Sequence, residues 1–599
     1  MAVIILEDGE SSITVTKKGI TIWLPFQVFG KEWKDLMGRL QEAIKQRPIH
    51  IFAPRMMSER DSDPDAPRWK ERLLDALSWI VYLLKVPVGH ELVKLWNVIP
   101  WSKINEIGGT EYKNAHSGSH AWAPAQVMAM LILMFGYGVM HETMIVALVQ
   151  ENIVWCWFCG FSYFAGFPAH DALYELRNRL GVVKFEELLT IVVQACLEAQ
   201  LVSNLLANID LTDVIASAHR WSPYERAVIV SRTMIRYLEL VWAKQVPEEP
   251  FPEVLKKLAA EVALESLPHK SMKGVNPERV VKSVEKWEEE AEGSEPVWKV
   301  ASDEIVEQLE AEEIAPDLQA VKSKSARIES LRQNLGEWLK GIAKKVIEKM
   351  PHARGDQNAR VGRTTSYTWF CGYLMGFVVD SKHQVITAVV LAAGNIKQYK
   401  LFKPALKAHS GRLGNPQAMA ADSAFDEFEV HHELDQEGIT GHITSRDHAQ
   451  PRDGGYGTDR VTWVERSDQP LCPGDAPLAA KTKSRDGRQV FEGTACKVCD
   501  SYSRCHPKGE GEPKQFSLNP QTHRRWQKNR SHCQTEEYKD AQARRFTSEG
   551  RFGLAKMNHR GARAPYRSDD MNLIAGLMIA IVMDLRILAQ HQHIERGKT

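Results

Sequence analysis

Between Thr368 and Ser445 the chain alternates strand-like and helix-like segments, and this alternation restricts the fold more than any other feature. Thr368–Asp380 and Gln384–Ala392 have the composition of two paired strands joined by a short turn. A short helix, a strand at Gln417–Ser423, a second helix and a strand at Gly441–Ser445 follow. Because alternation of this kind is typical of a sheet covered by helices, the sequence predicts the α/β class with a mixed sheet.

Two acids occur within short apolar strands. Asp422 ends the strand at Gln417–Ser423, and Asp210 lies in the apolar segment Ala207–Thr212, more than two hundred residues earlier. A carboxylate in such a setting costs free energy unless it has a partner or a function. We therefore treat both as candidate site residues.

A third acid lies alone among bases in the segment Arg545–Lys556. On a helix, Arg545 would share a face with Glu549 four residues later, and Lys556 would return to that face seven residues further on. A carboxylate held beside cations suits a site for a metal ion and a phosphate, because the metal needs hard oxygen ligands and the phosphate needs positive charge.

Converging Asp210, Asp422 and Glu549 would give a catalytic metal site. Three carboxylates around one point repel each other, and divalent cations relieve that repulsion. Two Mg²⁺ (or Mn²⁺) ions about 3.5–4 Å apart can activate the attacking oxygen and stabilise the leaving oxygen of a phosphodiester.

The segment around Glu549 also predicts a DNA-binding face. From Gln521 to Ser568 there are twelve Lys or Arg and four Asp or Glu, which is 12 − 4 = +8, whereas the whole chain has 76 of each. Arg545, Arg551 and Lys556 are the candidates for DNA phosphate contacts. Trp526, which lies among bases, is either a stacking platform for an unpaired base or a half-exposed helix side chain.

Three motifs in this order resemble those of insertion-sequence DDE transposases, which have a ribonuclease-H-like core. The first is Asp210-Leu211-Thr212, and the second is Ala421-Asp422-Ser423-Ala424-Phe425-Asp426. The third has Arg545, Glu549 and Lys556 at the spacing of a Tyr-x2-Arg-x3-Glu-x6-Lys signature, with Gln542 where that branch of the family has Tyr.

The resemblance implies a DNA transposase that binds the terminal inverted repeats of its own element. It would hydrolyse phosphodiester bonds at the ends and join the 3′-hydroxyl to target DNA, with Asp210, Asp422 and Glu549 binding the metals. It also implies a homodimer on double-stranded DNA and a bacterial-type cytoplasmic location on the nucleoid. The alternatives are a catalytically silent DNA-binding protein derived from a transposase, a metal-dependent nuclease without joining activity, and a zinc-dependent structural protein.

The same resemblance suggests a domain order. Residues 1–67 have no assigned role, and residues 68–203 form a helical domain expected to bind DNA ends. The catalytic core would consist of 204–222, 351–450 and 521–599, interrupted by a helical insertion at 223–350 and a cysteine-containing insertion at 451–520.

Four cysteines of the second insertion have the spacing C-x23-C-x2-C-x5-C: Cys472, Cys496, Cys499 and Cys505. A CxxC pair with two further thiols can hold Zn²⁺ and order a segment too small for its own core. His506 or Cys533 could replace one ligand, and free thiols are the alternative. A second CxxC pair, Cys156 and Cys159, lies among aromatic residues and is expected to pack in a core.

Other acids compete with the three chosen ones. Asp213 could replace Asp210 but is expected at a strand edge or surface, and Asp426 is expected at a helix start. Glu536 and Glu537 lack the flanking Arg and Lys of Glu549.

Composition restricts the class of protein less sharply. In 599 residues the hydrophobic fraction is 44%, enough for packed cores. The first residues are acidic, unlike a secretory signal, and the longest apolar runs are shorter than the roughly 20 residues that span a bilayer. These short runs predict no membrane partner, and nine cysteines without a secretory context predict reduced thiols.

Overall fold

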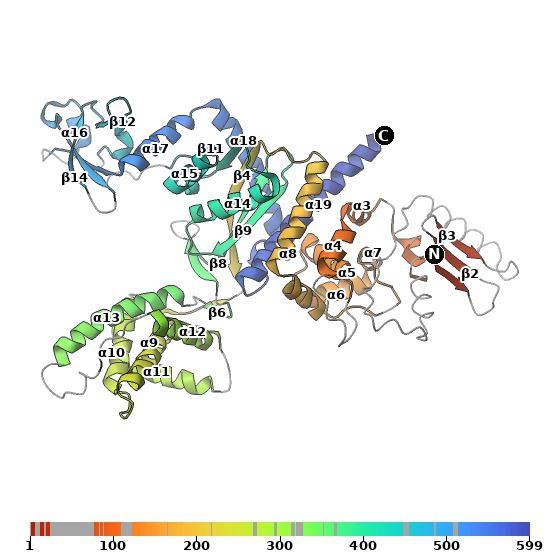
Figure 1. Cartoon of the computed structure of the whole chain (residues 1–599), viewed down its shortest axis with the longest axis horizontal. Coiled ribbons are helices and arrows are strands. Elements are labelled where there is room, and N and C mark those ends of the chain that lie inside the picture. The colour runs from red at the N-terminus through yellow and green to blue at the C-terminus, as the bar shows by residue number, and fades with distance from the viewer. Residues whose placement is uncertain are drawn as a thin grey trace.

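The computed structural model describes most of the chain beyond residue 76 (Figure 1). The described residues are 2–5, 12–16, 19–23 and 77–598, the last range with gaps at 79, 83, 88, 110–121, 165, 217, 268–271, 293–295, 313–317, 319–327, 351–352, 357, 364–367, 447–454, 484–486 and 507–512. Most of the region 1–67, to which the sequence assigns no role, lies outside these residues.

A seven-stranded mixed sheet forms the centre of the molecule. Its strands are β4 (Leu206–Ala216), β7 (Arg360–Arg363), β8 (Trp369–Asp380), β9 (Ile386–Ala393), β10 (Ala418–Ala421), β11 (Thr440–Ile443) and β17 (Arg563–Ala564). The order is β11-β10-β4-β8-β7, with β9 also paired to β8 and β17 to β4. β4, β10, β11 and β17 are parallel, while β8 runs antiparallel to β4, β7 and β9. The predicted strand pair at 368–392 is therefore confirmed.

Strand β8 is apolar throughout because both of its faces are buried. Side chains alternate between faces along a strand. Met375 and Phe377 join the core on one side of the sheet, whereas Leu374 and Val378 join the core on the other side. A continuous apolar run of this kind is what a strand covered on both faces requires.

Helices of the N-terminal half and the last helix cover one face of the sheet. They are α3 (Glu91–Val98), α4 (Trp101–Gly109), α5 (Pro124–Gly136), α6 (Glu142–Glu151), α7 (Ile153–Phe158), α8 (Asp171–Glu198) and α19 (Asp569–Lys598). Cys156 and Cys159 are buried in this core, as predicted. One helix in the described part of the chain, Asp569–Ile594, is long and apolar enough to cross a membrane, but 78% of its apolar window is buried in the protein. Such burial is typical of a core helix.

The opposite face of the sheet carries α14 (Phe402–Leu413) and α15 (Phe428–Gln436), each preceded by a 3₁₀ turn, η5 (Gln398–Leu401) and η6 (Ser423–Phe425). Phe402 and Phe425 meet edge to face there, with ring centroids 6.0 Å apart. The helices predicted between the strands are confirmed, with α14 longer than expected.

Five helices lie between β4 and β7 in the sequence: α9 (Pro223–Gln245), α10 (Glu253–Ser266), α11 (Pro277–Glu290), α12 (Val297–Glu312) and α13 (Ile328–Lys349). Figure 1 shows them gathered into a body of their own beside the sheet, which the short pair β5 (His219–Arg220) and β6 (Ala353–Arg354) joins to the rest. The interpretation of this body as an insertion in a ribonuclease-H-like core stays a prediction.

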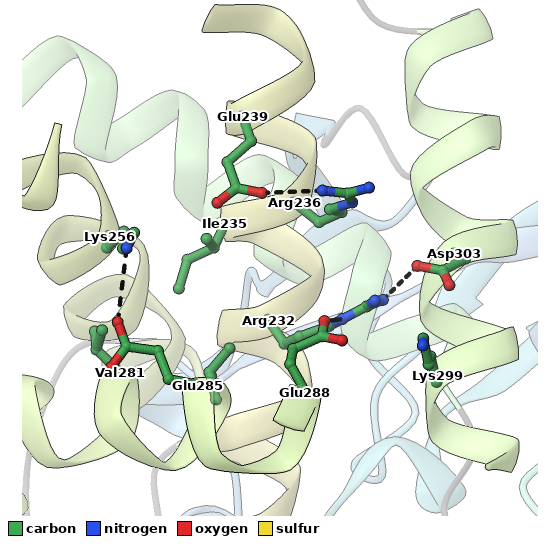
Figure 2. A pocket seen from close by; sticks show the side chains of 11 residues that line it. Arg232, Ile235, Arg236, Glu239, Lys256, Val281, Glu285, Glu288, Lys299 and Asp303 are labelled. Carbon is green, nitrogen blue, oxygen red and sulfur yellow. Dashed lines mark hydrogen bonds and ion pairs between the residues drawn. The ribbon is translucent and has the colours of Figure 1, made fainter. Parts of the chain in front are cut away.

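A cavity of about 520 Å³ in this helical body is lined largely by charged side chains (Figure 2). The buried guanidinium of Arg232 pairs with Glu288 and Asp303, both at 2.5 Å. Lys256 lies 2.6 Å from Glu253 and 3.6 Å from Glu285. These cations are therefore neutralised by acids of the same body, and the pairs crosslink α9 to α11 and α12.

The cysteine-containing segment forms small sheets. β12 (Thr462–Val464) pairs with β13 (Gln469–Leu471), and β14 (Leu478–Lys483) pairs with β15 (Gln489–Gly493), which pairs with β16 (Gln515–Leu518). The 3₁₀ turns η7 (Thr458–Arg460) and η8 (Cys496–Val498) and the helix α16 (Tyr502–Cys505) complete it. Then α17 (Pro520–His532) and α18 (Glu536–Asn558) return the chain to the sheet (Figure 1).

The described N-terminal residues form a separate antiparallel sheet, β1 (Ala2–Ile5), β2 (Ser12–Thr16) and β3 (Gly19–Trp23). Its role stays unassigned.

Candidate active site

The register of two parallel strands brings the first two acids together. β10 pairs with β4 through Ala418–Leu206, Met419–Ala207 and Ala420–Asn208. Asp422 and Asp210 each lie two residues beyond the last of these pairs, so the same register continues to both acids. Adjacent strands lie about 4.8 Å apart, which puts the two carboxylates in the same neighbourhood. Asp422 also caps the 3₁₀ turn η6, because its Oδ1 accepts a hydrogen bond from the Ala424 N–H at 3.0 Å.

Helix α18 is held against these strands by buried polar contacts. Asn208, on the same face of β4 as Asp210, donates to Ser548 Oγ at 2.8 Å. Gln542 donates from Nε2 to the carbonyl oxygens of Ala421 at 3.2 Å and His442 at 2.6 Å. One residue after Ser548, Glu549 therefore stands close to the ends of β4 and β10.

The guanidinium of Arg545 connects the first and third acids. Its Nη1 lies 3.5 Å from Asp210 Oδ2, and its Nη2 lies 2.9 Å from Glu549 Oε1. Its Nε donates to Gln542 Oε1 at 2.8 Å. Because the Arg545 side chain is only 8% exposed, these three partners account for its burial.

The pKa of Asp210 responds to the charges of the other two acids. Burial, together with the neighbouring carboxylates of Asp422 and Glu549, raises the pKa of Asp210 to about 6. The hydrogen bond from the Leu211 N–H and the charge of Arg545 act on that pKa in the opposite direction. An excess of negative charge therefore collects around Asp210, and one cation offsets part of it.

Three carboxylates of this kind fit hard divalent cations, which prefer oxygen ligands. As the side chains stand, no group of three or more His, Cys, Asp or Glu among the described residues is close enough to hold a metal ion. Arg545 explains this at the candidate site, because its guanidinium lies between the Asp210 and Glu549 carboxylates. A bound ion would require that guanidinium to move aside.

The competing acids have other partners. Asp213 pairs with Lys556 at 3.6 Å. Asp426 accepts from the Asn529 Nδ2 at 2.9 Å and the Arg446 N–H at 2.7 Å, so it fixes the loop after β10. Glu536 pairs with Lys539 on the outer side of α18.

Three residues expected to contact DNA lie against other parts of the chain. The guanidinium of Arg545 contacts the carboxylates of Asp210 and Glu549. Arg551 donates to the His383 carbonyl oxygen at 3.3 Å, and its guanidinium is largely buried. Trp526 is 9% exposed and donates from Nε1 to the Arg446 carbonyl oxygen at 3.0 Å, so its ring packs in the protein and is not free to stack on a base.

Sequence reasoning missed Gln542 as a site residue. It replaces the expected tyrosine, yet it fastens α18 to β10 and β11 and orients Arg545. Its position three residues before Arg545, on the same helix face, is the signal that could have revealed this role.

Two segments of the chain match known protein families. Residues 81–179, which include α3 to the start of α8, match the transposase domain (DUF772). Residues 471–589, which include α18 with Glu549, match the transposase DDE domain. No curated protein and no solved structure matches the chain. Both matched families are transposase families, and together they support an insertion-sequence DDE transposase.

Proposed function

We propose that this transposase cuts DNA at the terminal inverted repeats of its own element and joins the freed ends to target DNA. The observation that carries the proposal is the meeting of three acids from distant parts of the chain. Asp210 lies on the central strand, Asp422 follows the adjacent strand, and Glu549 lies on the helix that packs beside both. Arg545 contacts two of them directly.

The sheet supports a ribonuclease-H-like core for this site. The path β9-β8-β4-β10-β11 has an antiparallel arm, β9 and β8, followed by three parallel strands. The branch with the Tyr-Arg-Glu-Lys signature is supported by Arg545, Glu549 and Lys556, with Gln542 as the departure from it.

Asp210, Asp422 and Glu549 would hold Mg²⁺ or Mn²⁺. When bound, such ions activate the attacking oxygen and stabilise the leaving oxygen of a phosphodiester. The chain's own contribution is to fix the three carboxylates on rigid elements: Asp210 within β4, Asp422 at the end of β10 and Glu549 on α18. Arg545, once moved from the carboxylates, would be free to contact a DNA phosphate.

The reaction has two steps at one site. Water attacks the phosphorus at the element end, and the bond to the 3′-oxygen breaks, which leaves a 3′-hydroxyl on the element. That hydroxyl then attacks a target phosphodiester, forms the new bond and releases a target 3′-hydroxyl. The helices of residues 81–179 would bind the ends, and a homodimer would hold two ends together on double-stranded DNA.

Cleavage of a DNA that carries the element's ends tests this function. Wild type should nick the ends with Mg²⁺ and not with EDTA, while Glu549→Gln and Asp422→Asn should bind the ends without nicking them. Glu536→Gln is the matched control, since that acid lies on the same helix and pairs only with Lys539 among its described ion pairs. Undiminished cleavage by Glu549→Gln would remove it from the site.

The same assay separates the alternatives. A joined product from a pre-cut end and a target plasmid would support strand transfer. Nicking without joined product would favour a nuclease. Binding without cleavage in every condition would favour a silent DNA-binding protein.

A further inference from the structure

A second group of potential metal ligands lies outside the acid site, in the β12–β16 segment. A cavity of about 360 Å³ there is lined by four thiols, those of Cys472, Cys496, Cys499 and Cys505. They come from positions up to 33 residues apart in the sequence, and the fold alone brings them to one cavity. None of them belongs to a disulfide.

Three of the cysteines lie in two tight turns. After β13, the Cys472 carbonyl oxygen accepts from the Asp475 N–H, and the Cys472 N–H donates to the Ala476 carbonyl oxygen, both at 2.9 Å. Cys496 and Cys499 flank the 3₁₀ turn η8, in which the Cys499 N–H donates to the Cys496 carbonyl oxygen at 3.4 Å. Cys505 is the last residue of α16.

Two glycines leave room for the sulfur atoms. A Cβ built on Gly474 would lie 2.8 Å from Cys499 Sγ and 3.9 Å from Cys472 Sγ. A Cβ built on Gly493 would lie 2.4 Å from Cys496 Sγ. Any side chain at either position would collide with a thiol, so both glycines preserve the space in which the thiols gather.

A lysine stands beside the thiols. Lys514 lines the same cavity, and its Nζ donates to the Cys505 carbonyl oxygen at 3.0 Å. A cation beside the cavity favours thiolates, the form in which cysteine binds metals.

The surrounding segment has little core of its own. Among its described residues, the buried hydrophobic cluster consists of six: Val461, Trp463, Leu478, Phe491, Phe516 and Leu518. A segment with so few buried apolar side chains usually needs a disulfide, a metal ion or a partner to hold its fold.

We propose that Cys472, Cys496, Cys499 and Cys505 bind one structural Zn²⁺ as four thiolates. The side chains as they stand are not close enough to hold an ion, so the thiols turn inward about their Cα–Cβ bonds as zinc binds. Each thiol releases its proton to solvent, and four Zn–S bonds of about 2.3 Å close a tetrahedral site. With no open position, the ion stabilises the segment and takes no part in DNA chemistry.

His506 is excluded from this ligand set. Its ring stacks on Tyr502, with centroids 4.7 Å apart, and it does not line the cavity. His506→Asn therefore serves as a matched control adjacent to Cys505.

The test is metal analysis of the full chain purified without chelator and with a reductant. We expect one zinc per chain in wild type and in His506→Asn, and at least a tenfold loss in Cys472→Ser and Cys499→Ser. Titration of the wild-type thiols with a mercurial reagent should release one zinc ion for every four thiols that react. Replacing zinc by Co²⁺ should give the charge-transfer absorption of a tetrathiolate site.

The mercurial titration keeps the proposal open to refutation even where a Cys variant does not fold. Zinc-free wild type with four freely reactive thiols would overturn it, as would two disulfides in the non-reduced protein. Loss of zinc in His506→Asn would overturn the ligand set. None of these measurements uses DNA. The zinc site can therefore be confirmed even if the proposed transposition is wrong, and it can be refuted even if transposition is confirmed.

Discussion

Arg545 Nη2 lies 2.9 Å from Glu549 Oε1, one helical turn apart on α18, and the same guanidinium reaches Asp210 on β4. Spacing alone predicts the contact within the helix, but not the second contact. Arg545 thus holds two candidate metal ligands together in the absence of metal. Its guanidinium supplies the positive charge that these carboxylates need. A bound metal ion would compete with the guanidinium for the same position.

Removal of this cation should make the protein depend more on metal. In EDTA, Arg545→Gln leaves the carboxylates of Asp210 and Glu549 without their partner, which should lower stability by about 1–3 kcal/mol. Added Mn²⁺ should then raise the melting temperature of the variant more than that of wild type. Thermal unfolding with and without Mn²⁺ measures both effects.

Arg544→Gln is the control for this comparison, because Arg544 pairs with the exposed Asp540 on the same helix at 3.0 Å. Its metal-induced shift should equal that of wild type. Equal shifts in all three proteins would mean that Arg545 does not occupy the metal position.

Replacement of Gln542 should loosen α18 from the sheet. Gln542→Leu keeps most of the side-chain volume but leaves the Ala421 and His442 carbonyl oxygens without this donor. An unsatisfied buried polar group costs about 1–3 kcal/mol, so the urea midpoint should fall. Lys539→Ala, an exposed change on the same helix, should have the same urea midpoint as wild type within experimental error. A Gln542→Leu midpoint as high as that of wild type would contradict the role of Gln542 in holding α18 to the sheet.

A side chain at Gly372 should disrupt the pairing of β4 with β8. A Cβ there would lie 2.0 Å from the Val214 carbonyl oxygen, which is backbone and cannot swing away. We expect Gly372→Ala to lose about 3 kcal/mol or more. Gly411→Ala, on α14 with nothing within 4 Å of the new Cβ, should be neutral or slightly stabilising. Chemical unfolding measures the stability of the two variants. Equal stability would rule out the close approach of Gly372 to the Val214 backbone.

Acid should weaken the packing of α14 on β9 through His409. Burial lowers the pKa of His409 from 6.5 to about 4, and its ring nitrogens contact Thr387 Oγ1 at 2.6 Å and Asn204 Oδ1 at 2.8 Å. In the unfolded chain the ring takes up a proton below pH 6.5, whereas in the folded chain it stays neutral until about pH 4. Its contribution to stability is therefore complete above pH 6.5 and declines by up to about 3 kcal/mol towards pH 4.

The His409 effect is measured as the fall in melting temperature between pH 7 and pH 5. His409→Gln cannot take up the proton, so its melting temperature should fall less than that of wild type over the same interval. An equal fall in both proteins would assign the acid sensitivity to other groups.

Local pattern and motif spacing were enough to predict five of the seven strands of the sheet and the helices between them, but not β7 or β17. β8 and β9 have apolar runs bounded by turn residues, and Asp422 follows a short strand, as expected. The side-chain directions around the acids were not predictable. The contact from Arg545 to Asp210 depends on how α18 packs across β4, and the burial of Trp526 depends on the carbonyl group of Arg446. Both are long-range contacts that no local periodicity encodes.

The central strand β4 has its partners in three later parts of the chain: β8 at 369–380, β10 at 418–421 and β17 at 563–564. During synthesis on the ribosome, Asp210 therefore emerges long before the segments that give it neighbours. Asp422 follows 212 residues later and Glu549 a further 127. A growing chain therefore has no complete acid cluster until Glu549 has been translated and helix α18 can pack against β4.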